Sequence, residues 1–142
     1  MNATDITNIE QACAKLSILY ANCLDTFEHD TVLGLFAPDG VWNHMTKGPL
    51  RGQDAIREFL AGRNRQLLLR HVASNSEVNV ISATKATGRS YWTAYVATPG
   101  EGGKLPTIAG PHSIGAYDDE YVCIDGRWLF ATRTMNLLFT AA

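Results

Sequence analysis

The chain contains 142 residues, of which 46% are hydrophobic and 18% charged, and its net charge is −2. This length fits one domain spanning residues 1–142, and the hydrophobic content argues against a disordered chain. The charge balance offers no basic surface for nucleic acid or an anionic membrane, and no apolar run approaches the ~20 residues that span a bilayer.

Three cysteines, Cys13, Cys23 and Cys123, occur without paired spacing. This odd count argues against a disulfide framework and against a zinc site, so each cysteine should pack as a small hydrophobe. The first ten residues are polar and carry acids, without a basic-then-apolar signal pattern. We therefore expect a cytoplasmic protein with reduced cysteines.

A long amphipathic helix is predicted near the N-terminus. Residues 7–10, Thr-Asn-Ile-Glu, match a capping box, in which the threonine hydroxyl and the glutamate side chain each bond the other's backbone amide. The apolar spacing predicts a helix from about Asn8 to about Leu24 or Phe27. Its apolar face follows four- and three-residue steps through Ile9, Cys13, Leu16, Tyr20, Cys23 and Phe27.

Two shorter helices and a strand are expected next. Asp30 can cap a short helix whose apolar residues are Val32, Leu33 and Phe36. Residues 38–40, Pro-Asp-Gly, end this helix because proline disfavours a helical residue before it, and a short strand begins at residues 41–42. Residues 48–52 form another break, and a third helix runs from Asp54 to about Gln66.

After Leu69 the hydrophobic period changes to two residues, which is typical of strands. We expect strands at Arg70–Ile81, Thr87–Thr98, Ser113–Ile124 and Arg127–Phe139. Pro99–Pro111 is predicted to be a long hairpin loop, and Asp125-Gly126 a two-residue turn. Helices followed by hairpins predict an α+β fold, in which a curved antiparallel sheet and the helices enclose one small-molecule pocket.

A family resemblance is carried, in chain order, by Tyr20–Asp25, Leu35–Trp42, Leu50–Ile56, Arg70–Val72, Tyr117–Tyr121 and Asp125–Trp128, leading to Arg133. Over nearly the whole chain the pattern resembles the SnoaL-like enzymes of the nuclear transport factor 2-like superfamily. The resemblance implies a cone-shaped α+β barrel, with N-terminal helices packed on a curved, mostly antiparallel sheet. It also implies a homodimer formed through the outer face of that sheet.

Within that superfamily, the chain resembles scytalone dehydratase, the bile-acid dehydratases and lindane dehydrochlorinase in an aspartate–histidine pair. The resemblance places the aspartate on Asp25 and the histidine on His71. Tyr20 matches the phenol of the dehydratases, and Arg133 matches the arginine of the last strand. The chain departs from the dehydratases over Thr93–Val96, which offers no acid or amide as a further polar partner.

These four residues suit general acid–base chemistry. His71 is the candidate base because imidazole accepts protons near neutral pH, and Asp25 can hold one ring nitrogen and stabilise the imidazolium. Tyr20 can bind a substrate carbonyl or a leaving hydroxyl, and Arg133 can stabilise an oxyanion. They predict a lyase or isomerase acting on a small, apolar, cyclic substrate without a metal or an organic cofactor.

Each residue also has a structural explanation. His71 and Asp25 can be ordinary strand and helix-end residues, and Tyr20 can be a core tyrosine on the apolar stripe. At ~100° per residue, Tyr20 and Asp25 lie about 140° apart on a straight helix. They reach one site only if the helix ends or bends near Leu24.

Arg133 alternates with apolar residues and should face inward, where it needs a partner or a ligand. Its structural alternative is an ion pair with Asp119 or Glu120 on the neighbouring strand. We interpret the remaining basic cluster as a solvated face, made of Arg63, Arg65 and Arg70.

The competing function is a non-catalytic ligand-binding or assembly module, such as the small subunits of ring-hydroxylating dioxygenases, because a fold does not fix a function. No metal site is predicted, since the other histidines lack ligand spacing with acids or cysteines: His29, His44 and His112.

Overall fold

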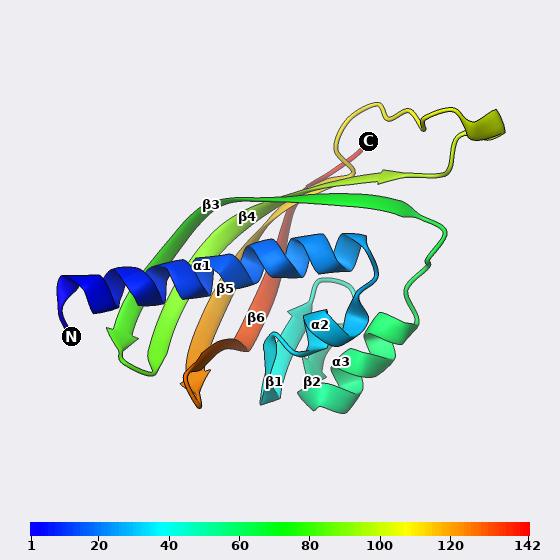
Figure 1. Cartoon of the computed structure of the whole chain (residues 1–142). Helices are drawn as coiled ribbons and strands as arrows, with labels where there is room; N and C mark the ends of the chain where they lie inside the picture. Colours follow the sequence, from blue (N-terminus) through cyan, green and yellow to red (C-terminus); the bar gives the residue numbers. More distant parts are fainter.

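A computed structural model describes all 142 residues. The helices are α1 (Ala3–Asp25), α2 (His29–Leu33) and α3 (Gly52–Ala61), with one short 3-10 turn, η1 (Glu101–Gly103). The strands are β1 (Phe36–His44), β2 (Gly48–Arg51), β3 (Leu68–Ser82), β4 (Lys85–Ala97), β5 (Ser113–Ile124) and β6 (Arg127–Thr140). Figure 1 shows α1 lying across one face of the curved sheet, with α2 and α3 grouped near β1 and β2.

The strands form one six-stranded mixed sheet in the order β2-β1-β6-β5-β4-β3. β1 and β6 run parallel, and all other neighbours are antiparallel, so the predicted mostly antiparallel sheet is confirmed. Asp125 and Gly126, with φ of 51° and 77°, form the predicted turn between β5 and β6. The long strands β3 to β6 begin and end within a few residues of their predicted bounds.

α1 begins at Ala3, ahead of the predicted start at Asn8. Asn2 is the N-cap: its side chain accepts from the Asp5 amide at 2.9 Å, and Asp5 accepts from the Asn2 amide at 3.0 Å. This is the reciprocal arrangement predicted for residues 7–10, placed further upstream. The predicted box lies inside the helix, where backbone amides already have partners within the helix.

The first strand is longer than predicted. β1 begins at Phe36, so this residue belongs to the strand and not to α2. The predicted turn at residues 38–40 lies within β1, where the register against β6 shifts between Phe36 and Val41. Such an irregularity lets a strand accommodate proline and glycine while it continues.

Residues 48–51, predicted as a break, form the edge strand β2. Pro49 is tolerated because an edge strand leaves one row of backbone groups unpaired. α3 ends at Ala61 and not near Gln66. Gly62 is the C-cap residue, and its backbone N–H donates to the Glu58 carbonyl.

Aromatic side chains fill the core between α1 and the sheet. Trp42, Trp92, Tyr20 and Phe130 are among the largest fully buried residues. The Tyr20 ring meets Trp42 and Phe130 edge-on, with centroids 5.5 Å and 6.2 Å away. Edge-to-face pairs of this kind stabilise a core beyond simple burial.

Gly115 on β5 makes room for the Trp92 indole. A Cβ at this position would lie 2.0 Å from Cη2 of Trp92. The indole therefore lies across β5, where its Nε1–H donates to Ser113 Oγ at 3.2 Å. Its ring packs on Tyr117 with centroids 4.7 Å apart.

One cavity of the protein lies away from the predicted site residues. A cavity of about 1030 Å³ lies toward the N-terminal half of α1 and is lined by neither Asp25 nor His71. On α1, the cavity is lined by Glu10, Gln11 and Ala14.

Gly115→Ala tests the packing of this interior. The added methyl group collides with the Trp92 ring, so we expect the free energy of unfolding to fall by about 1–3 kcal/mol in urea denaturation. Gly110→Ala is the control because nothing lies within 4 Å of its added Cβ. Its stability should change by less than about 0.5 kcal/mol, and equal stabilities of the two variants would contradict this packing.

Candidate active site

α1 ends at Asp25, and its C-terminal cap determines where that carboxylate points. The Glu28 N–H donates to the Cys23 carbonyl at 2.9 Å, and the Phe27 N–H donates to the Leu24 carbonyl at 3.3 Å. With the positive φ of Phe27, 57°, these bonds form a Schellman motif. Because the helix stops here, the Asp25 side chain reaches past the helix end toward β3.

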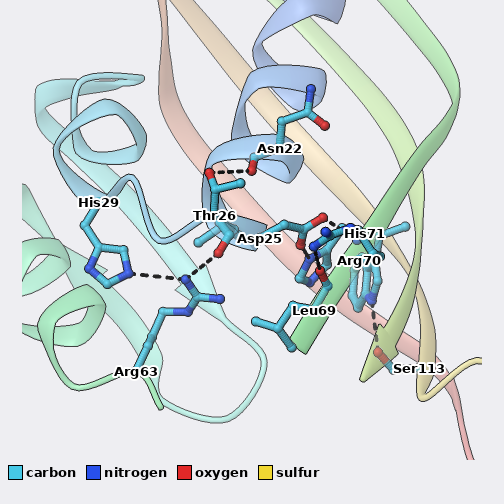
Figure 2. A network of polar contacts seen from close by, with 11 residues as sticks. Asn22, Asp25, Thr26, His29, Arg63, Leu69, Arg70, His71 and Ser113 are labelled. Carbon is cyan, nitrogen blue, oxygen red and sulfur yellow. Dashed lines mark hydrogen bonds and ion pairs between the residues drawn. The ribbon is translucent and has the colours of Figure 1, made fainter. Parts of the chain in front are cut away.

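Asp25 and His71 are joined by two hydrogen bonds (Figure 2). The His71 backbone N–H donates to Asp25 Oδ2 at 2.8 Å, and the ring Nδ1–H donates to Oδ1 at 2.5 Å. Because an ionised carboxylate can only accept, the ring proton sits on Nδ1 and the lone pair on Nε2. We call these two residues the dyad.

The dyad is partly open to solvent. The His71 side chain is 18% exposed and the Asp25 side chain 6%. The protein engages His71 through its backbone N–H and Nδ1, which leaves Nε2 free. A carboxylate at a helix C-terminus faces the negative end of the macrodipole, and the two donors of His71 offset that cost. The arrangement presents one imidazole nitrogen to a ligand.

Arg63 lies beside the dyad, although the sequence analysis assigned it to a solvated face. It is half-buried, and Nη1 donates to the Leu24 carbonyl at 2.9 Å and to His29 Nε2 at 3.3 Å (Figure 2). Its guanidinium also lies 4.9 Å from the centre of the Phe27 ring. Arg63 therefore satisfies an end carbonyl of α1 and secures the turn that presents the dyad. The other two arginines of that face are exposed: Arg65 and Arg70.

Tyr20 faces the core and does not hydrogen-bond the dyad. The residue is 1% exposed, and its buried hydroxyl has no partner with hydrogen-bond geometry. Burial raises the pKa of Tyr20 well above its ordinary value, so the phenol stays protonated. The ring behaves as the core-packing alternative predicts, while the hydroxyl lacks the partner that packing would require.

Arg133 points inward, as its alternation predicted, and is fully buried. Nε donates to Asp119 Oδ1 at 3.0 Å, and Nη2 donates to Asp119 Oδ2 at 3.1 Å and to Ser17 Oγ at 2.7 Å. The Tyr121 hydroxyl also donates to Asp119, at 3.1 Å. Burial raises the pKa of Asp119, and the guanidinium opposes that rise. The ion-pair alternative is confirmed for Asp119 and not for Glu120, which is exposed.

Tyr117 and Trp92 belong to the same interior, although the sequence analysis gave neither a role. The Arg133 guanidinium carbon lies 3.6 Å from the centre of the Tyr117 ring and 4.3 Å from that of Tyr20. Burial raises the pKa of Tyr117 to about 12. Two-residue alternation along β5 was the signal that could have found this inward-facing phenol.

The four predicted site residues fall into two clusters. Asp25 and His71 form the dyad at the end of α1, whereas Tyr20 and Arg133 stack on each other deeper in the core. No hydrogen bond joins the two clusters. Tyr117 belongs to the second cluster, where it contacts both Tyr20 and Arg133.

Comparison with known proteins identifies the family. The profile of the SnoaL-like domain matches residues 2–134. The chain belongs to this family. It is similar to the structure of a protein assigned as a scytalone dehydratase from Novosphingobium aromaticivorans DSM 12444, with a TM-score of 0.80 and 25% identity over 99% of this chain and 91% of that one.

Other structures resemble this SnoaL-like protein at similar or lower identity. A Mycobacterium tuberculosis protein of unknown function is 26% identical, with a TM-score of 0.78 over 97% of this chain and 77% of that one. A hexachlorocyclohexane dehydrochlorinase from Novosphingobium barchaimii LL02 is 16% identical, with a TM-score of 0.77 over 99% of this chain and 93% of that one. At this identity the likeness shows the fold alone, the nuclear transport factor 2-like cone. No curated protein matches the sequence significantly.

No group of three or more His, Cys, Asp or Glu side chains is arranged to hold a metal ion. None of the helices is long and apolar enough to cross a membrane. The cysteines are all free, with Cys13 and Cys23 buried and Cys123 half-buried.

Asp119→Leu tests the dependence of the core on its ion pair. The variant leaves the buried Arg133 charge without its partner, so we expect a loss of about 3–5 kcal/mol in the free energy of unfolding, measured with urea. The double variant Asp119→Leu/Arg133→Met should recover most of that loss, because neither charge remains buried.

The exposed pair Asp54–Arg57, 2.8 Å apart, is the control. Asp54→Ala should cost less than about 1 kcal/mol, because solvent screens this contact. A double variant as unstable as Asp119→Leu alone would contradict the explanation by an unpaired charge.

Proposed function

We propose that this SnoaL-like protein is a cofactor-independent lyase or isomerase, in which His71 removes a proton from a small, apolar, cyclic substrate. The observation that carries the proposal is the double contact of Asp25 with His71, at 2.8 Å and 2.5 Å, which leaves Nε2 free. Membership of the SnoaL-like family and the 25% identical structure assigned as a dehydratase add support.

The dyad has the parts that a general base needs. Asp25 holds Nδ1–H, which fixes the tautomer and directs the Nε2 lone pair away from the helix end. When Nε2 takes a proton from carbon, the nearby carboxylate stabilises the imidazolium. A positioned base of this kind typically contributes about 10²–10⁴-fold to the rate.

The proton can then follow one of two routes. In an elimination, the electrons of the broken C–H bond form a double bond, and a hydroxyl departs with its bonding pair and takes the proton from the His71 imidazolium as water. In an isomerisation, the imidazolium returns the proton to a different carbon. Both routes restore the neutral imidazole and need no oxidant or reductant. Tyr20 would bind a substrate oxygen. Arg133 would act only through its contact with the Tyr20 ring, because its charge is paired with Asp119.

Non-catalytic ligand binding or subunit association is the second candidate function. It is favoured by the cavity of about 1030 Å³, which neither Asp25 nor His71 lines. A protein assigned as an aromatic ring hydroxylase from Novosphingobium aromaticivorans shares the fold at 23% identity, with a TM-score of 0.73 over 94% of this chain and 91% of that one. An assembly module, however, has no need of an imidazole held by a buried carboxylate with its second nitrogen free.

Proton exchange separates these two functions. We would incubate the wild type with cyclic hydroxy-ketones in D₂O and follow exchange at the carbon beside the carbonyl by NMR. This reports proton removal whether or not a leaving group departs. His71→Gln should slow the exchange by about 10²–10⁴-fold because the base is lost. Asp25→Asn should slow it comparably, since an amide can donate to Nδ1 and favour the wrong tautomer.

His112→Gln is the matched control because His112 is an exposed histidine outside the dyad. It should exchange like the wild type, and thermal unfolding would establish that every variant is folded. Wild-type exchange rates in His71→Gln would eliminate the imidazole as the base. If the wild type exchanges a proton in none of the hydroxy-ketones, non-catalytic ligand binding or subunit association is favoured.

We also propose that two copies of the chain associate through the outer face of the sheet. Strand register places Val72, Ile114 and Phe139 in one row on this face, where Val72 is 49% exposed and Phe139 67%. An exposed apolar row favours association in water. In a dimer with two-fold symmetry, the apolar row of one copy would face the same row of the other copy. Arg89 and Asp118 are exposed on this face, so each copy presents one positive and one negative charge to its partner.

Sedimentation tests this association. The wild type should sediment as a dimer at micromolar concentration, and Val72→Asp as a monomer because the new charge would be desolvated in the interface. Leu105→Asp is the control, since Leu105 is 90% exposed in the loop before β5. A clean wild-type monomer would contradict the proposal.

A further inference from the structure

The C-terminal turn of α1 lacks a cation of its own. A helix C-terminus is the negative end of the macrodipole and is stabilised by positive charge, but the last turn of α1 contains no basic residue. The helix ends on Asp25, whose carboxylate adds negative charge there. Arg63, from the segment between α3 and β3, supplies the cation, because its Nη1 donates to the Leu24 carbonyl at 2.9 Å (Figure 2). A residue 39 positions along the chain thus completes the helix that carries the dyad.

The charge of Arg63 is not paired with a carboxylate. None of the salt bridges of the protein includes Arg63, although its side chain is half-buried. Burial lowers the pKa of Arg63, and the neighbouring Tyr20 and Asp25 oppose that fall. Arg133 is the contrast, since Asp119 takes up its charge. The Arg63 guanidinium is therefore the cation whose field reaches the carboxylate of the dyad.

His29 holds the Arg63 guanidinium from the other side. Arg63 Nη1 lies 3.3 Å from His29 Nε2 (Figure 2). Because a guanidinium can only donate, the contact requires a lone pair on Nε2, and the His29 ring is neutral with its proton on Nδ1. The ring also meets the Phe27 ring edge-on, with centroids 5.8 Å apart. The contact between His29 and Arg63 therefore exists in only one protonation state of the imidazole.

The surroundings of His29 keep it neutral. Burial lowers the pKa of His29, the charges of Arg63 and Arg65 lower it further, and Asp30 opposes them. The small cavity beside the ring is lined by two further charged residues of opposite sign, Glu28 and Arg57. A histidine with a lowered pKa is neutral at neutral pH and becomes charged only in acid. The contact with Arg63 is thus complete at neutral pH and is lost as the pH falls through that lowered value.

We propose that Arg63 and His29 are positioning residues of the dyad, which make the orientation of Asp25 depend on the protonation state of His29. This inference rests on the proposed function and adds a means of regulating it. Neutral His29 keeps Arg63 on the Leu24 carbonyl, where its charge stabilises the helix end and the carboxylate beside it. Protonated His29 cannot accept a hydrogen bond and repels the guanidinium. The last turn of α1 then loosens, and Asp25 no longer fixes the ring of His71.

The Nδ1–H proton of His71 is the probe, because a proton in a short hydrogen bond to a carboxylate resonates far downfield in the NMR spectrum. Arg63→Met should move this resonance upfield and slow proton exchange of the hydroxy-ketones by about tenfold, the effect of one charged hydrogen bond. Arg63→Lys keeps the charge and a donor, so it should restore most of both. Arg65→Met is the matched control, since Arg65 lies 5.5 Å from the centre of the same Phe27 ring but is exposed.

Two variants separate the charge of His29 from its contact. His29→Gln keeps an uncharged acceptor at every pH, so its resonance should match the wild type at neutral pH and change less in acid. His29→Lys is charged and cannot accept, so at neutral pH it should shift the resonance as Arg63→Met does. Equal pH dependence in the wild type and His29→Gln would overturn the proposal. So would a wild-type resonance in His29→Lys.

Folding and catalysis are followed separately. Thermal unfolding establishes that each variant is folded, and the His29 variants carry the test if Arg63→Met is not. A lower melting temperature of Arg63→Met without any shift of the resonance would reveal a purely structural arginine and overturn the proposal. A resonance that responds to Arg63 and His29, in a protein that exchanges no proton, would retain the positioning role and remove the lyase. Equal exchange in the wild type, Arg63→Met and His29→Lys would remove the positioning role and leave the proposed function.

Discussion

The contact between Asp25 and His71 joins the last residue of α1 to β3, and the rest of the site is arranged around it. β3 is the edge strand of the sheet, so alternate backbone N–H groups of this strand have no strand partner. One of these is the backbone N–H of His71, which donates to Oδ2 of Asp25. The other carboxylate oxygen, Oδ1, accepts from the ring Nδ1–H of the same histidine. A single residue thereby satisfies a free edge donor, docks the helix end and sets the imidazole tautomer.

Buried charge in this protein is balanced within each cluster. Arg133 and Asp119 neutralise each other, and the guanidinium is further held by Ser17 and by the faces of aromatic rings. Buried ion pairs contribute little net stability over apolar residues of the same volume. Leucine and methionine at these two positions should therefore recover most of the stability that the loss of one charge alone would cost.

The sequence predicted those elements whose physics is local. Alternation located β3 to β6, and Asp125-Gly126 marked their last turn, because a strand face and a two-residue turn depend on neighbouring residues. The start of α1 was misplaced because two successive segments, residues 2–5 and 7–10, satisfy the capping-box pattern. Only the turn of helix before Thr7 decides between them. Asp25 and His71 lie 46 residues apart, so family resemblance and not periodicity paired them. The sequence did not indicate the position of Arg63, because its side chain contacts residues that lie far away in the chain, such as Leu24.

Trp92 shows why alternation alone does not locate the open space of the interior. Alternation tells which side chains point inward, but not how much of the interior their volume leaves open. Gly115 removes a side chain from β5, and the Trp92 indole takes the space across it. Ser113, which holds the indole at 3.2 Å, is the first residue of β5 after the long loop from Pro99 to Pro111. The position of the Trp92 indole is therefore tied to the strand end that follows this loop.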